Sequence, residues 1–234
     1  MEANRHALER ELLDSPRRMY FSPAYLSQYR ITLPLIQKFA SGKLIDVGCG
    51  DTPFRDYISD RISDYDSLDL YPRRPDITYK ADIQDMAIIG DETYDSALCL
   101  EVLEHVPDPL KALTEIYRIL KIGGVLILSV PHLSRLHDEP ADYYRFTKYG
   151  LRHMLEHTGF RIVALERRGG LLSFLGHQIA TFWLAAFWRV PILKYFVWHL
   201  NAWLVTRFLF AVDQFVNPEG IFAMGYSVVA KKDS

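Results

Sequence analysis

The chain has 234 residues, 49% of them hydrophobic, and 27 Lys and Arg against 29 Asp and Glu give a formal net charge of −2. This apolar fraction is enough for a full core and excludes a disordered chain. The balanced charge argues against a nucleic-acid partner, because nucleic-acid binders carry a basic excess. Two cysteines, Cys49 and Cys99, are too few for a disulfide framework or a cysteine-rich zinc site. With a charged N-terminus that lacks the apolar stretch of a signal peptide, these features predict a cytoplasmic protein.

The first 168 residues alternate between helical and extended patterns. Residues 1–42 are predicted to be helical, and a glycine-terminated apolar run, LPLIQKF, ends this segment. Helix caps are predicted at Asp108, which precedes a proline, and at Thr147, whose helix stops at Gly159. Apolar runs predict strands at 44–47, 65–70, 94–100, 125–130 and 160–166, with a short extended stretch at 77–81. Strands alternating with helices predict an α/β doubly wound sheet.

The segment after residue 168 has a different composition. Between Gly169 and Asn217 the charged residues are Arg189, Lys194, Arg207 and Asp213, and all four tryptophans lie in the same stretch. GYSVVAKK (225–232) then reads as one more strand. We therefore divide the chain into an N-terminal segment (1–42), a core (43–168), an apolar helical insertion (169–224) and a final core strand (225–234).

A glycine loop follows the first predicted strand in LIDVGCGDTP (44–53). Gly48 and Gly50 allow the backbone to approach a ligand closely. The dinucleotide fingerprint requires a further glycine where this chain has Pro53, so an NAD site is not favoured. Thr52 and Pro53 are instead predicted to begin a helix.

Three carboxylates each follow their own extended run. Asp46 ends the first strand and suits a ligand ammonium group, whereas Asp69 ends the second and can accept both hydroxyls of a ribose. Asp82 follows the third and can meet an adenine amino group. An ammonium, a ribose and an adenine together describe S-adenosylmethionine.

The sequence resembles the class I S-adenosylmethionine-dependent methyltransferases, in the branch with the ubiquinone/menaquinone-type methyltransferase domain. The matching segments are LIDVGCG, SLDLY, ADIQDM, YDSALCLEVLEHVPDP, LTEIYRILKIGGVLILSVP and GYSVVAKK. The resemblance implies a Rossmann-like sheet of seven strands with an antiparallel last strand. It also implies cofactor contacts from Asp46, Gly48, Cys49, Gly50, Asp69, Leu70, Asp82, Ile83, Leu100 and Glu101. Thr52 replaces a third glycine of many members, so we expect a changed loop shape with retained binding.

A second resemblance covers residues 131–160, with the stretch HDEPADYYRFT. This segment is similar to methyltransferases of bacterial surface-polysaccharide and lipid-linked glycan assembly. Within this stretch we expect Tyr143, Tyr144 and Arg145 to shape the acceptor pocket, because arginine can grip a phosphate or carboxylate.

A hydroxyl acceptor needs a base, and neutral histidine is the usual one near pH 7. His105, His132 and His137 follow predicted strands at the ligand-binding edge, so they are the candidate catalytic residues. His137 is the first choice because charged residues crowd its loop. The alternative is that this loop is a hydrogen-bonded lid that only holds its own shape. No metal is predicted, although His132 and His137 with Asp138 offer an alternative cation site.

The apolar segment leaves three interpretations open. They are a soluble lid or homodimer interface, an interfacial membrane anchor with Arg189, Lys194 and Arg207 toward lipid phosphates, and a membrane-spanning hairpin. The favoured function is O-methylation of a lipid-linked glycan or another hydrophobic acceptor by an enzyme peripheral to the inner face of the membrane. The alternatives are C-methylation of a quinone-like precursor and a non-catalytic module that binds S-adenosylmethionine.

Overall fold

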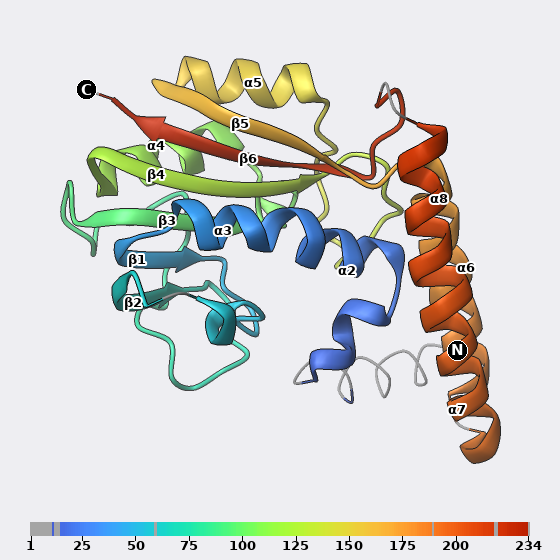
Figure 1. The fold of residues 1–234 in the computed structure, drawn as a ribbon. Coiled ribbons are helices and arrows are strands. Elements are labelled where there is room, and N and C mark those ends of the chain that lie inside the picture. Colours follow the sequence, from blue (N-terminus) through green and yellow to red (C-terminus); the bar gives the residue numbers. More distant parts are fainter. Residues whose placement is uncertain (1–10, 12–14, 59, 189, 218–219, 234) are drawn as a thin grey trace. The chain divides into compact units, whose positions relative to one another are not determined.

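A computed structural model describes residue 11 and residues 15–58, 60–188, 190–217 and 220–233. Its centre is a six-stranded sheet in the order β2-β1-β3-β4-β6-β5 (Figure 1). The strands are β1 (Gly42–Val47), β2 (Ile62–Leu68), β3 (Tyr94–Leu100), β4 (Leu120–Pro131), β5 (Phe160–Arg168) and β6 (Gly225–Lys232). Strands β2, β1, β3 and β4 are parallel, whereas β6 is antiparallel to β4. The predicted α/β sheet with an antiparallel last strand is confirmed.

Helices cover the sheet on both faces. In Figure 1, α3 (Leu33–Phe39) lies on the near face and α4 (Pro109–Ile119) on the far face, and both contact β4. The side chains of Leu126, Ile127 and Leu128 in β4 are accordingly fully buried. This double burial explains why residues 125–130 show no polar alternation.

The predicted helix caps are confirmed. Asp108 accepts a hydrogen bond from the N–H of Lys111 at 3.1 Å and begins α4. Thr147 accepts one from the N–H of Gly150 at 3.0 Å and begins α5 (Lys148–His157). Gly159 follows α5 with a φ of 97°, a conformation that glycine adopts without strain.

The sheet has six strands where we predicted seven. The extended stretch at 77–81 pairs with the end of β2 only through one parallel bridge, between Leu68 and Tyr79. Two backbone hydrogen bonds flank this bridge, from Tyr79 N–H to Ser67 O and from Asp69 N–H to Tyr79 O. The chain then turns at Asp82, whose carboxylate accepts from the N–H of Gln84. The turn stops further pairing, so the expected third strand is reduced to a single bridge.

The chain divides into two compact units. One unit joins Met1–Thr32 with Arg167–Met224, and the other joins Leu33–Glu166 with Gly225–Ser234. We call them the helical unit and the sheet unit. The prediction separated the N-terminal segment from the apolar segment 169–224, whereas the structure groups most of both into the helical unit.

The helical unit contains α6 (Leu171–Phe187), α7 (Pro191–Leu200), the π-helix η5 (Asn201–Phe208) and α8 (Leu209–Val216). Its N-terminal elements are η1 (Pro16–Tyr20), α2 (Pro23–Ser27) and η2 (Gln28–Thr32). Asn201 donates from Nδ2 to the carbonyl of Phe21 at 2.8 Å, and the Thr206 hydroxyl donates to the carbonyl of Tyr20 at 3.0 Å. These bonds tie the N-terminal segment to η5.

A buried carboxylate joins two helices of this unit. Asp213 of α8 is fully buried and accepts from the N–H groups of Leu172 and Ser173 at 3.1 and 3.3 Å. The Ser173 hydroxyl donates to the same carboxylate at 2.5 Å. Asp213 therefore occupies the N-terminus of α6, where negative charge is stabilised by the helix dipole.

Two of the four tryptophans are buried in this unit. Trp188 and Trp198 pack edge to face with ring centroids 6.1 Å apart, whereas Trp203 is 66% exposed. Arg189 of the predicted anchor lies outside the described residues. Within the described part of the chain, no helix is both long enough and apolar enough to cross a membrane.

Candidate functional site

The loop after β1 is built on two glycines with positive φ. Gly48 and Gly50 have φ angles of 67° and 50°. The N–H groups of Gly48 and Cys49 donate to the carbonyl of Leu68 at 2.7 and 3.1 Å, which fixes the loop to the end of β2. A Cβ at Gly48 would lie 2.5 Å from Val102, whereas a Cβ at Gly50 would meet nothing within 4 Å. The loop is therefore packed at Gly48 and open at Gly50.

Thr52 adopts a backbone conformation that usually belongs to glycine. Its φ is 51°, which is rare for a β-branched residue, and its N–H donates to the carbonyl of Cys49 at 2.8 Å. The predicted helix with Thr52 as its cap does not form. A single 3₁₀ turn, η3 (Arg55–Tyr57), follows instead, and its N-cap residue is Phe54.

Asp46 is a buried carboxylate beside this loop. Its Oδ2 accepts from the Tyr65 hydroxyl at 2.8 Å. Burial raises the pKa of Asp46 to about 7, and the nearby charge of Asp69 also raises it, although the Tyr65 hydrogen bond acts in the opposite direction. Burial likewise raises the pKa of the Cys49 thiol to about 12, so this side chain stays neutral and the loop offers its backbone.

Asp69 follows β2 and orders the loop. Its Oδ2 accepts from the N–H of Gly50 at 2.9 Å, and its Oδ1 accepts from the N–H of Tyr71 at 2.8 Å. A carboxylate oxygen can accept two hydrogen bonds, so each oxygen keeps capacity for a hydroxyl. Asp69 can thus hold the loop and a ribose together.

The remaining predicted cofactor residues lie at the carboxyl ends of strands or in the turn after the bridge. Asp82 accepts from both the N–H and the side-chain amide of Gln84, and Ile83 is buried. Leu100 ends β3, and Glu101 follows with a φ of 56° and an N–H that donates to Ser129 O at 2.9 Å. Leu70 is exposed. A left-handed non-glycine residue such as Glu101 carries backbone strain, which is often stored near functional sites.

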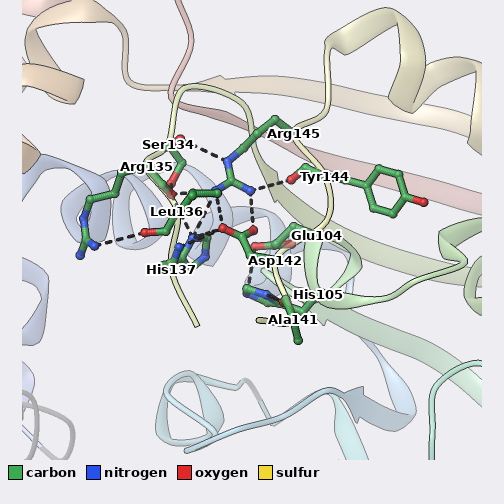
Figure 2. Close-up of polar contacts among 10 residues, drawn as sticks. All are labelled: Glu104, His105, Ser134, Arg135, Leu136, His137, Ala141, Asp142, Tyr144 and Arg145. Atoms are coloured by element: carbon green, nitrogen blue, oxygen red, sulfur yellow. Dashed lines mark hydrogen bonds and ion pairs between the residues drawn. The ribbon is translucent and has the colours of Figure 1, made fainter. Parts of the chain in front are cut away.

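Two of the three candidate histidines meet (Figure 2). The rings of His105, at the end of the 3₁₀ turn η4 (Leu103–His105), and His137 have centroids 4.8 Å apart at 78°. His105 Nδ1 lies 2.6 Å from the carbonyl oxygen of Ala141, and His137 Nδ1 lies 3.2 Å from that of Arg135. A carbonyl only accepts, so these two contacts are donated by Nδ1, and His137 Nδ1 also lies 3.5 Å from the Arg145 guanidinium.

The third candidate, His132, has a different environment. Its recorded ring neighbour is Tyr226 of β6, with centroids 5.8 Å apart. Its Nδ1 is buried and has no hydrogen-bond partner among the described residues. The structure thus groups His105 with His137 and gives His132 no place in that pair's hydrogen bonds.

Arg145 holds the loop between β4 and α5 rather than pointing free donors at a ligand. Its guanidinium donates to both oxygens of Asp142 at 2.6 and 2.8 Å. It also donates to the carbonyls of Ser134, Arg135 and Tyr144 at 3.2, 2.7 and 2.7 Å (Figure 2). These bonds use all five N–H groups of an arginine. The predicted grip on an acceptor phosphate is therefore at odds with the observed geometry, and Arg145 acts as an internal clamp.

The clamp also sets the charge state of its partner. The hydrogen bonds from Arg145 hold the pKa of Asp142 well below its usual range, and Asp142 in turn raises the pKa of Arg145. Asp142 accepts from the backbone N–H of His137 at 2.9 Å, so the clamp positions that histidine. Tyr144 donates from its hydroxyl to Pro107 O at 2.9 Å, whereas the Tyr143 ring is about half exposed.

Sequence reasoning missed one member of this cluster. Glu104 is fully buried, and its Oε1 lies 3.9 Å from His105 Nε2. The signal was available in LEVLEHVPDP, where a glutamate directly precedes a candidate histidine in the turn after a central strand. A carboxylate is costly to bury there unless it has a partner or a task.

Solved structures share this fold. An S-adenosylmethionine-dependent methyltransferase from Archaeoglobus fulgidus aligns with a TM-score of 0.58 at 18% identity, over 97% of this chain and 99% of that one. Another from Mesorhizobium loti aligns with a TM-score of 0.55 at 17% identity, over 88% and 97%. The sheet and its glycine loop therefore have the architecture of class I S-adenosylmethionine-dependent methyltransferases.

Residues 20–165, which are more than half of the chain, match the model of a family described as a methyltransferase domain. The chain belongs to this methyltransferase family. A curated relative is the ubiquinone biosynthesis O-methyltransferase of Xanthomonas oryzae pv. oryzae, 29% identical over 103 residues, which are 38% of this chain and 43% of that protein. The chain thus matches less than half the length of this relative.

The residues of the site fit the cofactor of this family, S-adenosylmethionine. The open side of the loop at Gly50 lies next to the Asp69 carboxylate, which hydrogen-bonds the Gly50 N–H and retains acceptor capacity. Asp46 is buried at the end of the neighbouring strand. This combination matches a ligand with two ribose hydroxyls and a cationic group. The domain is an S-adenosylmethionine-dependent methyltransferase domain.

Proposed function

We propose that this protein transfers the methyl group of S-adenosylmethionine to a hydroxyl oxygen of a hydrophobic acceptor, such as a lipid-linked glycan. The observation that carries the proposal is the pairing of His105 and His137, whose rings pack with centroids 4.8 Å apart and which each place a ring nitrogen within 4.8 Å of a Glu104 carboxylate oxygen. A hydroxyl, unlike a carbanion, must lose a proton during transfer, and this cluster is suited to remove it.

In this proposal the cofactor lies across the ends of β1, β2 and β3. Asp46 takes its ammonium group beside the Gly48–Gly50 backbone, and Asp69 takes the ribose hydroxyls. The remaining contacts are proposed for Leu70, Asp82, Ile83, Leu100 and Glu101. The bound cofactor supplies an activated methyl group that the acceptor oxygen takes as the carbon–sulfur bond breaks, leaving S-adenosylhomocysteine and a proton.

The residues of this chain then have two tasks. His105 and His137 receive the acceptor hydroxyl, with His132 kept as a third candidate, and the Arg145–Asp142 clamp holds the His137 loop in register. Tyr143, with its exposed ring, is the better candidate for an acceptor contact than Tyr144, whose hydroxyl donates within the protein. Alignment and exclusion of water supply most of the rate in such a transfer.

The hydrophobic acceptor is supported by two observations. The curated relative is named as an O-methyltransferase of ubiquinone biosynthesis. The helical unit exposes many large apolar side chains. Soluble proteins keep their exposed apolar patches small unless such a patch binds a partner, a ligand or a membrane. The exposed apolar side chains of the helical unit include Phe182, Ile192, Tyr195, Phe196, Trp203 and Phe215.

The test is methyl transfer from isotopically labelled S-adenosylmethionine to three acceptors: a polyprenyl-linked glycan, a polyprenyl phenol and a water-soluble glycan. Mass spectrometry and NMR of the product identify the methylated atom. We expect a methyl ether on a lipid-linked acceptor, and loss of most activity in His137→Ala. His153→Ala is the matched control, because His153 is an exposed histidine on α5. A methyl group on ring carbon would favour the quinone-like alternative, and no product from any acceptor would refute the proposal.

We further propose that the helical unit binds the membrane surface. Arg207 stacks between the rings of Tyr20 and Trp203, 3.8 and 4.4 Å from their centroids. Trp203, Leu204, Arg207 and Phe208 line an open hollow. An arginine framed by exposed aromatic side chains suits an anionic headgroup above a shallow apolar contact.

Vesicle co-sedimentation tests this surface. We expect binding to phosphatidylcholine vesicles to strengthen when phosphatidylglycerol is added, and to fall about tenfold or more in Trp203→Ala/Phe215→Ser, since each aromatic ring contributes about 1.5–3 kcal/mol when buried. Tyr149→Ser removes an equally exposed ring from α5 and serves as the control. A dimer in light scattering that the double variant dissolves, without vesicle binding, would assign the surface to a second copy instead.

A further inference from the structure

Three side chains of metal-binding type converge in the sheet unit. Glu104, His105 and His137 each offer one ligand atom, and these atoms all lie within 4.8 Å of one another. His105 Nε2 and Glu104 Oε1 are 3.9 Å apart. A tetrahedral zinc ion about 2.0–2.1 Å from each ligand atom needs those atoms about 3.4 Å from one another. Side-chain movements of less than about 1.5 Å would bring the three ligand atoms to this separation.

The two rings are already held as metal ligands usually are. In metal sites, the second ring nitrogen of a histidine donates to a carboxylate or a backbone carbonyl, which fixes the tautomer and the ring orientation. Here both Nδ1 atoms meet a backbone carbonyl, that of Ala141 for His105 and that of Arg135 for His137. For His105 this leaves Nε2, which lies 3.9 Å from Glu104 Oε1, to face the carboxylate.

The electrostatic surroundings favour a cation at this point. Glu104 is fully buried, and Glu101 precedes it by three residues. The guanidinium of Arg145, which lies 3.5 Å from His137 Nδ1, is already matched by Asp142. A divalent cation would balance the buried charge and bring three ligands together.

We propose that Glu104, His105 and His137 bind one divalent cation of the zinc class, leaving a coordination position open for the acceptor. This rests on the proposed function and specifies how the site activates a hydroxyl. Two imidazoles and one carboxylate favour Zn²⁺ or a similar transition ion over Mg²⁺, which prefers oxygen ligands. Three protein ligands with an open position are the arrangement of catalytic rather than structural zinc.

The role follows from the ligands. The acceptor hydroxyl binds at the open position, where the cation lowers its pKa and the proton leaves to solvent. The oxygen then forms its bond to the methyl carbon while the carbon–sulfur bond breaks, so no oxidant or reductant is needed. His105 and His137 act as ligands in this scheme, not as proton acceptors. The alternative cation site at His132, His137 and Asp138 shares only His137 with it.

Metal binding is measured without cofactor or acceptor. Protein stripped with a chelator is titrated with Zn²⁺, Mn²⁺ and Mg²⁺ by calorimetry, and with Co²⁺ by visible absorption. We expect one Zn²⁺ per chain, much weaker Mg²⁺, and d–d bands from Co²⁺. Glu104→Gln and His137→Ala should weaken Zn²⁺ binding by more than about 100-fold, because changes outside the ligand shell alone cost about 10–100-fold.

Two controls make the result decisive. His153→Ala should bind Zn²⁺ as the parent does. His132→Ala should also bind it as the parent does, because His132 is not one of the three proposed ligands. Stoichiometric Zn²⁺ binding that survives both ligand substitutions would overturn the proposal. The proposed cation site would be overturned if the protein bound no Zn²⁺. The proposed function would still stand if, in addition, methyl transfer survived the chelator and was abolished by His137→Ala. Circular dichroism of each variant separates loss of binding from loss of fold.

Discussion

The raised pKa of Asp46 makes cofactor binding depend on pH in a defined direction. Burial holds this carboxyl near pKa 7 in the free protein. The proposed contact with the ammonium group of S-adenosylmethionine requires the ionised form, so binding must remove a proton from Asp46 at pH values below 7. Affinity is therefore expected to rise with pH and to level off above 7. Asp46→Asn cannot ionise and should lose this dependence.

The magnitude follows from linkage. With a pKa of about 7 in the free state and a much lower one in the complex, the dissociation constant scales with 1 + 10^(7−pH). The factor is about 33 at pH 5.5 and about 2 at pH 7, a change of about 16-fold or about 1.6 kcal/mol. The window lies below the pKa of an α-amino group, about 7.7–8.0, so the ligand stays cationic throughout.

The same carboxyl sets a stability slope of opposite sign. A folded-state pKa above the unfolded value means that the free folded protein binds more protons than the unfolded chain between about pH 4 and pH 7. Stability contributed by protonated Asp46 is full at low pH and falls as pH rises through 7, by at most about 4 kcal/mol. Asp46→Asn should flatten this decline in urea unfolding measured at pH 5, 6 and 7.

Calorimetry in two buffers with different ionisation enthalpies counts the protons released on binding. We expect close to one proton at pH 5.5 for the parent protein and close to none at pH 8. S-adenosylhomocysteine, which has the same ammonium group, should behave alike. If Asp46→Asn binds the cofactor too weakly for calorimetry, the pH dependence of affinity and proton release in the parent protein still tests the prediction. Affinity independent of pH, with no proton released at pH 5.5, would refute the placement of the ammonium group at Asp46.

Three further predictions concern single side chains. Asp69→Ala removes the acceptor for Gly50 N–H and the proposed ribose contact, so cofactor affinity should fall at least about tenfold in calorimetry with unchanged circular dichroism. Asp213→Ala strips three donors of a buried partner and should destabilise the helical unit by about 2–4 kcal/mol. Tryptophan fluorescence reports this directly, since all four tryptophans belong to that unit. Arg145→Lys keeps the charge but loses the fork on Asp142, so hydrogen exchange in the 132–145 loop should accelerate, and protection equal to the parent's would contradict the clamp.

Local chemistry made much of the sheet unit predictable. The caps at Asp108 and Thr147 need only a short side chain and a following turn, and both were located from the sequence. The apolar run at 125–130 has no polar alternation, which predicted a strand covered on both faces, and this part of β4 is buried. Asp46 in β1 and Asp69 directly after β2 lie toward the carboxyl ends of two neighbouring parallel strands, as predicted from the apolar runs that precede them.

What failed depends on contacts that no local pattern carries. The stretch at 77–81 looks extended, but the turn at Asp82 limits it to one bridge. Thr52 was expected to cap a helix, whereas it takes a left-handed conformation within the loop. Arg145 was expected to face a ligand, and only the positions of three carbonyls around it reveal that its donors are already used. Glu104 was overlooked because its burial is a tertiary property.

The topology of the last two strands explains the composition of residues 169–224. Strands β5 and β6 are neighbours in the sheet, so the chain between them must leave and return at one point. Met224 N–H donates to Arg168 O at 2.9 Å and closes that point. A helix as long as α6, with 17 residues, needs an antiparallel return, and η5 with α8 supplies it. At Gly176 an added Cβ would lie 2.9 Å from Pro23, so the N-terminal segment packs tightly on α6. Gly176 is thus needed for helix packing, and the apolar sequence serves a core that residues from both parts of the chain complete.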